Sequence, residues 1–341
     1  MKIIIVASLP GPAQALVPAI KSLRHKYDCM VIGMPKDNSI YRGVGGSLKV
    51  FKSSFPETVD FAARFESRDK FTAWLKDESP NLALLGSVGD FEGNMSYIEK
   101  DVLTYAAELG IKTAQFIDSW GSWPVLPNAP DCFLLIDDLS RKIGRKFYPS
   151  HKNFYVSGHP GLEENYKSLR KLEREIFNEM RVCYFTQLGV NTQEVIKWLG
   201  QSLKPKDKLF IKKHPRDESD YSRYLKQFEC NVSIASKAPE ELYPEINFSV
   251  THTSVAGLKS CLFSVPTINV KPRVLMAKAY DMMKGYPLAL LGLSREVDSI
   301  IELKHALKNP LKVDIEKMVR IFHLEDAAER LVSKVKEITK W

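Results

Sequence analysis

Residues 2–33, KIIIVASLPGPAQALVPAIKSLRHKYDCMVIG, decide the fold class. Residues 2–7 are a short run rich in β-branched side chains, and a Gly-Pro pair closes it soon afterwards. Residues 14–24 carry apolar side chains at helical spacing, and residues 29–33 form a second short apolar run. Two strands joined by a crossover helix form a parallel pair. The stretch therefore predicts a βαβ unit at the start of a parallel sheet.

The same alternation continues to residue 157 and begins again after residue 180. Further strands are expected at residues 81–86, 113–117, 132–136, 154–157, 182–186, 208–212, 231–234, 247–251 and 267–270. Further helices are expected at residues 71–76, 98–109, 193–199, 257–262, 315–322 and 327–338. The pattern predicts an α/β protein with two Rossmann-like, doubly wound parallel-sheet domains that face a cleft.

The expected domains follow from the point at which the pattern restarts. Residues 1–162 form the N-terminal domain, and residues 163–180 form a helical connector. Residues 181–322 form the C-terminal domain; the first domain carries the acceptor and the second the donor only if the resemblance given below holds. Residues 323–341 form a final helix that we expect to pack back on the first domain.

The composition excludes several classes of protein. Hydrophobic residues make up 44% and charged residues 26% of the 341, which is typical of globular domains and argues against disorder. No apolar run reaches 18 residues, so we predict no transmembrane helix and a cytoplasmic protein. Five widely spaced cysteines, an odd number with no C-x-x-C pair, indicate reduced thiols.

The net charge of +8 favours an anionic partner. The basic residues are dispersed along the chain, so we do not expect nucleic acid. A phosphorylated substrate and peripheral contact with an anionic membrane both fit this charge.

The sharpest motif ends the strand expected at 208–212. Lys212, Lys213, His214, Pro215 and Arg216 follow one another there. Proline ends the strand sharply, and the imidazole and cations are then presented at its tip, where they suit a phosphate.

Two other strand ends of the second domain carry polar residues. Thr251, His252, Thr253 and Ser254 lead into a helix, whose first N–H groups and dipole favour phosphate. Ser254 or a neighbour is equally suited to cap that helix. Another loop, with Gly189, Asn191 and Thr192, follows the strand expected at 182–186 and is included in the expected phosphate site.

Candidate acids lie at strand ends of the first domain. Asp118 stands beside Trp120 and Trp123, so we expect a general base with raised pKa next to rings that stack on a sugar. The alternative is a capping aspartate over an aromatic core. Asp90 and Glu92 are rival bases, and Asp137 with Asp138 are expected to cap a helix. Gly11 would allow a ligand to approach the first loop closely.

Several cofactor motifs are absent from the sequence. It contains no G-x-G-x-x-G after a strand, no Walker A, no H-E-x-x-H and no G-x-S-x-G. It also contains no Asp-x-Asp pair. We therefore expect no cofactor and no essential metal.

Together these motifs resemble those of GT-B glycosyltransferases, and more narrowly the bacterial sialyltransferases and Kdo transferases that use CMP-activated sugars. The resemblance implies that His214 and Pro215 contact the donor, that Thr253 and Ser254 bind its phosphate, and that Asp118 is the base. It also implies inverting, metal-independent transfer from a CMP-sugar to a glycan acceptor in surface polysaccharide synthesis.

Two alternatives remain. A UDP-N-acetylglucosamine 2-epimerase is similar in fold, but such enzymes open with Gly-Thr-Arg-Pro-Glu and carry Asp-Ser-Gly-Gly in the second half. The corresponding positions here read Ser8-Leu9-Pro10-Gly11 and Thr251-His252-Thr253-Ser254. The second alternative is a non-catalytic protein that binds a nucleotide or a glycan, because the same fold can carry different functions.

Overall fold

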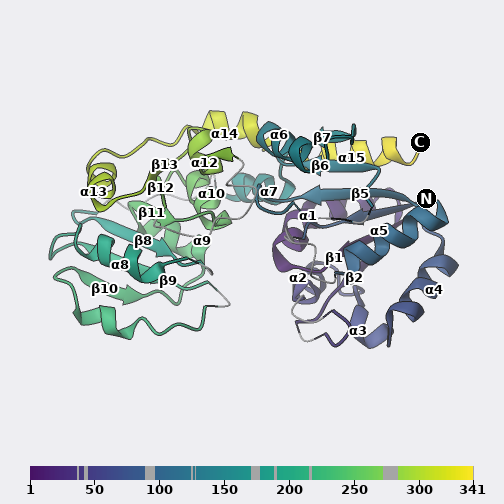
Figure 1. Cartoon of the computed structure of the whole chain (residues 1–341), viewed down its shortest axis with the longest axis horizontal. Coiled ribbons are helices and arrows are strands. Elements are labelled where there is room, and N and C mark those ends of the chain that lie inside the picture. Colours follow the sequence, from purple (N-terminus) through teal and green to yellow (C-terminus); the bar gives the residue numbers. More distant parts are fainter. Residues whose placement is uncertain are drawn as a thin grey trace. The chain divides into compact units, whose positions relative to one another are not determined.

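The chain forms two compact units (Figure 1). One contains Met1–Asn165 together with Val319–Trp341, and the other contains Tyr166–Met318. The computed structural model describes residues 1–36, 38–41, 45–88, 97–123, 126, 128–169, 177–187, 190–214, 217–271 and 283–340.

The first unit is built on a seven-stranded parallel sheet in the order β3-β2-β1-β4-β5-β6-β7. Its strands are β1 (Lys2–Ala7), β2 (Asp28–Gly33), β3 (Val59–Asp60), β4 (Leu82–Leu85), β5 (Lys112–Ile117), β6 (Cys132–Leu135) and β7 (Phe154–Val156). Residues Ile3 to Ala7 of β1 have no exposed surface, because helices cover both faces of the sheet.

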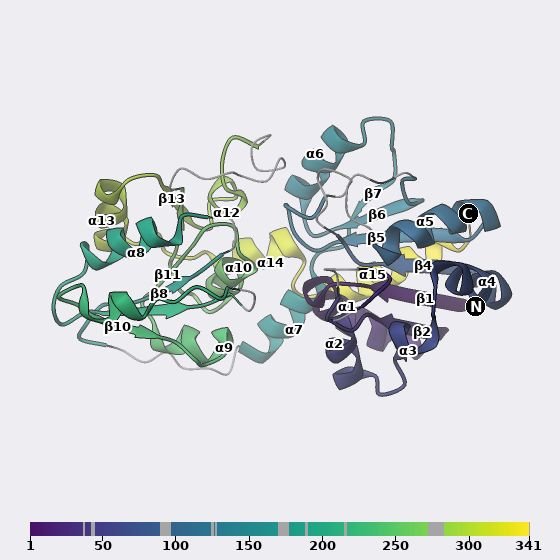
Figure 2. The same cartoon turned by 60° about the horizontal axis from the view of Figure 1, so that its bottom comes forward.

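The helices of this unit divide between those two faces. They are α1 (Pro10–Arg24), α2 (Ser47–Ser54), α3 (Phe61–Arg64), α4 (Arg68–Glu78), α5 (Ile98–Leu109), α6 (Asp138–Phe147) and α15 (Ala327–Ile338). On one face, Phe71 of α4 and Val102 of α5 pack with Val6 and Leu85 in a single core. On the other, α1 and α15 lie side by side against β5 (Figure 2).

The end of the chain is fixed to the first unit by hydrogen bonds. The N–H of Ala328 donates to Glu163 at 2.8 Å, and the Arg330 guanidinium donates to the carbonyl of Val156 at 3.0 Å. Helices α7 (Pro160–Leu169) and α14 (Ile315–Phe322) carry the chain between the units.

The second unit contains a six-stranded parallel sheet in the order β10-β9-β8-β11-β12-β13. Its strands are β8 (Arg181–Phe185), β9 (Lys208–Lys212), β10 (Asn231–Ile234), β11 (Phe248–Thr251), β12 (Thr267–Val270) and β13 (Arg295–Val297). Its helices are α8 (Thr192–Gly200), η1 (Ser222–Lys226), α9 (Pro239–Leu242), η2 (Tyr243–Glu245), α10 (Val255–Leu262), α12 (Pro287–Leu290) and α13 (Ile300–Lys308).

Two cores sandwich this second sheet. Leu199 of α8 and Leu303 of α13 pack on one face, and Leu242 of α9 packs with Phe185 on the other. Both units therefore have the predicted doubly wound, Rossmann-like architecture. Within the described parts of the chain, no helix has the length and apolar character that crossing a membrane requires.

Candidate functional site

The strand orders locate the ligand-binding edge of each unit. In open parallel sheets, ligands bind outside the carboxyl ends of the strands, where the strand order reverses. That point lies between β1 and β4 in the first unit and between β8 and β11 in the second. Asp118 follows β5, beside the first point, and Gln187 and Thr253 flank the second.

Asp118 is a buried carboxyl group at the edge of the first sheet. Its side chain is only 8% exposed and accepts a 2.5 Å hydrogen bond from the Ser87 hydroxyl at the end of β4. Burial raises the pKa of Asp118, and hydrogen bonds from Ser87 and Ser122 offset this only in part. A carboxyl group with raised pKa is better suited than an ordinary aspartate to exchange a proton with a substrate.

Gly11 leaves space beside that carboxyl group. A Cβ atom at Gly11 would lie 3.4 Å from Oδ2 of Asp118, and residue 11 is itself exposed. The first turn of α1 therefore approaches the candidate base with no side chain in between, and Gly11 lies inside this helix rather than in a loop before it.

Glu99 is a second buried acid at this edge, which the sequence did not single out. It has no exposed surface, and its Oε1 accepts a 2.6 Å hydrogen bond from the N–H of Ser8, directly after β1. Burial raises the pKa of Glu99 to about 7. Glu99 therefore holds the first loop in place and is ready to titrate near neutrality.

The two tryptophans near Asp118 belong to the core, which corrects the sugar-stacking expectation. Trp123 has no exposed surface and stacks on Phe147, while Trp120 is 5% exposed and donates its Nε1–H to Asp137 at 2.7 Å. Packing these rings inside removes more apolar surface from water than an exposed platform would. Asp137 caps α6 as expected, accepting from the N–H of Ser140.

The second unit joins two strand-end loops through one side chain. Gln187, after β8, donates its amide to the Thr253 hydroxyl at 2.7 Å and accepts from the Thr253 N–H at 3.0 Å. Ser254 then caps α10 by accepting from the N–H of Ala256 at 3.2 Å. Gly257 allows α10 to lie close to β11, because a Cβ atom there would be 2.7 Å from Thr251. A fixed helix N-terminus thus lies at the switch point.

Thr251 and His252 lie behind this loop and are buried. His252 is 1% exposed and its Nε2 is 3.0 Å from the hydroxyl of Tyr184. Burial lowers the pKa of His252 to about 4, so the ring is neutral at physiological pH. Among the residues that the structure describes, the buried Thr251 hydroxyl has no hydrogen-bond partner.

The cations near His214 have neighbours within the unit. The Lys212 ammonium points to the carbonyls of Ala235 and Ser236, at 3.5 and 3.3 Å, and the Lys213 ammonium lies 6.0 Å from the centre of the Tyr221 ring. The His214 N–H donates to the Thr186 hydroxyl at 2.9 Å. The loop that follows β9 and contains His214, called here the His214 loop, is thus tied directly to the residue after β8.

A polar cavity of about 230 Å³ lies at the same edge of the second unit, lined in part by Gln187, Thr192 and Tyr221. Asn191 borders it and caps α8 by accepting from the N–H of Glu194, and Thr192 is the first residue of that helix. Both residues thus lie where the sequence expected a donor loop. Asp90, Glu92, Gly189 and Pro215 lie outside the described residues.

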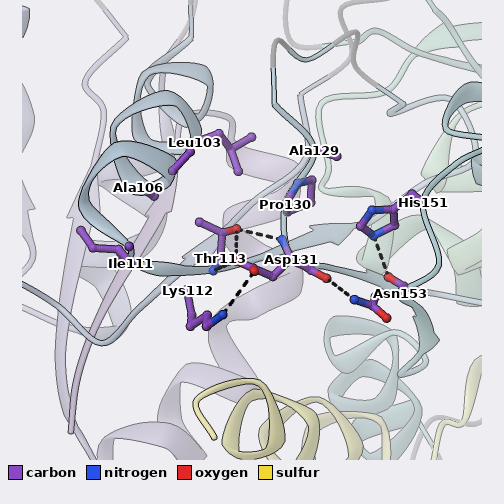
Figure 3. Close-up of a pocket in the computed structure, with 12 residues that line it drawn as sticks. Leu103, Ala106, Ile111, Lys112, Thr113, Ala129, Pro130, Asp131, His151 and Asn153 are labelled. Carbon is purple, nitrogen blue, oxygen red and sulfur yellow. Dashed lines mark hydrogen bonds and ion pairs between the residues drawn. The ribbon is translucent and has the colours of Figure 1, made fainter. Parts of the chain in front are cut away.

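A larger cavity, of about 370 Å³, lies at the opposite edge of the first sheet (Figure 3). Asp131, just before β6, accepts hydrogen bonds from the N–H and the hydroxyl of Thr113 at 2.8 and 2.9 Å. Asn153 donates to the Asp131 carbonyl, and His151 contacts the Asn153 carbonyl. These groups bond to one another at the amino ends of β5, β6 and β7. The arrangement joins the strands and leaves the carboxyl edge as the candidate site.

Comparisons with known proteins agree with this architecture. No family model matches the sequence, and no curated protein matches it. The UDP-GlcNAc 2-epimerase from Neisseria meningitidis, solved bound to UDP-GlcNAc, is 13% identical, with a TM-score of 0.65 over 99% of this chain and 100% of its own. Acinetobacter baumannii MurG is 9% identical, with a TM-score of 0.58 over 98% and 99%.

A third similar structure is the glycotransferase of kitacinnamycin. It is 12% identical, with a TM-score of 0.60 over 99% of this chain and 98% of its own. At such low identity the likeness concerns the fold. With two parallel Rossmann-like sheets and these neighbours, the chain has a GT-B-like α/β fold.

Proposed function

We propose that this protein is an enzyme acting on a nucleotide-activated sugar, with a UDP-type donor. The observation that carries the proposal is the arrangement at the switch point of the second unit. There Gln187 holds Thr253 directly before α10, whose N-terminus Ser254 caps. N–H groups at such a helix start, together with the helix dipole, favour a diphosphate.

The choice of UDP replaces the CMP donor that the sequence resemblance implied. The Neisseria epimerase was solved bound to UDP-GlcNAc, and a similar epimerase from Methanocaldococcus jannaschii in complex with UDP-GlcNAc and UDP. No CMP-sugar is named for the Neisseria epimerase, for MurG or for the kitacinnamycin glycotransferase. A sialic-acid or Kdo donor and a role in surface polysaccharide synthesis are therefore not part of the proposal.

Epimerisation at C2 is the reaction that the comparisons favour. It requires a proton to leave C2 while the C1–O bond to UDP breaks, and a proton to reach the opposite face of C2 while UDP adds back at C1. A carboxyl group with raised pKa is suited to one of these proton transfers. Asp118 is the group that we assign to this step, since burial raises its pKa.

Glycosyl transfer is the second candidate, favoured by the exposed Gly11 next to Asp118, where an added Cβ atom would lie 3.4 Å from Oδ2. In that reaction Asp118 takes the proton of an acceptor hydroxyl, which attacks the anomeric carbon. His214 and the start of α10 would stabilise the leaving diphosphate. A glycan acceptor and contact with an anionic membrane remain predictions from the sequence.

The test is incubation with UDP-GlcNAc in D2O, with and without candidate acceptors, after titration with UDP, CMP and GDP. Deuterium at C2 without acceptor would support epimerisation, whereas UDP release that depends on an acceptor would support transfer. Asp118→Asn should abolish either activity and keep UDP binding. If no nucleotide binds, the proposal fails.

A further inference from the structure

A single hydroxyl group joins the end of β8 to both ends of the His214 loop. Thr186 lies directly after β8, and its Oγ1 accepts a 2.9 Å hydrogen bond from the N–H of His214. The same hydroxyl donates to Oδ2 of Asp217 at 2.6 Å. The N–H of Asp217 in turn donates to the His214 carbonyl at 2.8 Å, which closes the loop.

Asp217 is the centre of this network. Its side chain is 9% exposed, and it also accepts from the Tyr221 hydroxyl at 2.8 Å and the Ser219 N–H at 3.1 Å. Burial alone would raise the pKa of Asp217, but the hydrogen bonds from Thr186, Tyr221 and Ser219 outweigh it and lower the pKa below its ordinary value. Asp217 is therefore an anion at neutral pH, able to accept all of these bonds at once.

Two consecutive residues after β8 therefore each form hydrogen bonds to a different neighbouring loop. Thr186 holds the His214 loop after β9, and Gln187 holds Thr253 in the loop after β11. The strands β9 and β11 lie on either side of β8 in the sheet. A change at Thr186 would therefore free one loop from the strand and leave the other attached.

We propose that Thr186 and Asp217 are positioning residues that fix His214 at the nucleotide site of the second unit. This inference rests on the proposed function. Neither residue has to touch the ligand. Thr186 fixes the position of the His214 main chain, and Asp217 fixes the orientation of the Thr186 hydroxyl. Without the network, His214 would occupy several orientations, and binding would have to select one of them.

The experiment compares wild type with Thr186→Val, Thr186→Ser and Asp217→Asn. Valine keeps the shape of threonine and loses the hydroxyl, whereas serine keeps the hydroxyl. Thr113→Val is the matched control, since Thr113 is a buried threonine that also donates to an aspartate, Asp131, in the first unit. The readouts are UDP affinity by calorimetry and the imidazole NMR signals of His214, assigned with His214→Ala.

We expect Thr186→Val and Asp217→Asn to bind UDP about tenfold more weakly, which is the size of one lost charged or shared hydrogen bond. Their His214 signals should broaden or shift. Thr186→Ser should restore affinity and signal, and Thr113→Val should change neither. If Thr186→Val does not fold, Asp217→Asn and Thr186→Ser decide.

Unchanged affinity and unchanged His214 signals in a folded Thr186→Val or Asp217→Asn protein would overturn the inference. Failure of the proposed function looks different, because wild type itself would then bind no UDP. In that case the His214 signals still report whether Thr186 and Asp217 position the ring.

Discussion

Asp118 and Asp217 are both buried aspartates near the carboxyl ends of parallel strands, and their surroundings shift their pKa values in opposite directions. Each lies beyond a strand at the carboxyl edge of its sheet, at 8% and 9% exposure. Burial raises the pKa of Asp118. At Asp217, hydrogen bonds from two hydroxyls and a backbone N–H outweigh burial and lower the pKa.

The balance between burial and hydrogen bonding explains the difference. The hydroxyl hydrogen bonds from Ser87 and Ser122 and a backbone hydrogen bond do not outweigh the burial of Asp118, whereas those from Thr186, Tyr221 and Ser219 outweigh the burial of Asp217. A buried carboxylate whose burial dominates gains from taking up a proton, whereas one whose hydrogen bonds dominate stays ionised. The first arrangement suits acid–base chemistry, and the second suits a fixed structural anion.

The largest expected effect is on turnover. Asp118→Asn should lower the rate with a UDP-sugar by about 10²–10⁴-fold, because it removes the group that exchanges the proton. UDP affinity, measured by calorimetry, should stay within about twofold. Asp131→Asn, in the same unit at the opposite edge of the sheet, is the control. Full activity in Asp118→Asn would leave Asp90, Glu92 or Glu99 as the base.

The second prediction concerns stability, and its sign differs between the two sites. The pKa of Asp118 is higher in the folded than in the unfolded protein. Ionisation of Asp118 therefore lowers the free energy of unfolding, and this loss grows as the pH rises from the ordinary aspartate pKa through the raised pKa. Asp118→Asn should therefore stabilise the protein by about 1 kcal/mol at pH 8, with no gain at a pH below that ordinary value.

Asp217 should show the reverse. Its lowered pKa contributes stability above the ordinary value, and this is lost as pH falls through the lowered pKa. Asp217→Asn should cost about 1–3 kcal/mol at pH 8 and less in acid. Melting temperatures of both variants across pH test the pair, and shifts of the same sign would contradict the comparison.

A smaller effect should follow from removing one donor at Asp118. Ser87→Ala deletes a hydrogen bond that lowers the pKa of Asp118, so the acid limb of the kcat/KM profile should move to higher pH. Ser87→Thr keeps a hydroxyl and should leave the limb near its wild-type position. An unmoved limb in Ser87→Ala would show that another group titrates.

The elements of the fold were predictable wherever their signals are local. Residues 208–212 and 98–109 coincide with β9 and α5, and α5 ends where Gly110 adopts a left-handed φ of 69°. The strands β3 and β13 were missed, since two and three residues are too few to show a period.

The site was predictable only in part. Strand ends pointed to Asp118 and His214, but Ser87, Thr186 and Gln187 act through partners that lie 31, 28 and 66 residues away. No spacing rule links such pairs before the sheet order is known. The expectation for Trp120 and Trp123 was wrong because a tryptophan beside an acid can face the core as readily as a ligand.

The smallest expected effect is that of metal chelation on the turnover rate. This experiment tests whether Asp118 binds a proton or a metal ion. Divalent cations prefer several anionic oxygens, whereas the described neighbours of Asp118 offer it hydroxyl and backbone hydrogen bonds. We therefore expect EDTA to change the turnover rate by less than about twofold. In this proposal His214 and the N-terminus of α10, and no metal ion, balance the negative charge of the diphosphate. Loss of activity that Mg²⁺ or Mn²⁺ restores would instead make Asp118 a candidate metal ligand. Asp118 and Asp217 would then differ in partner as well as in protonation.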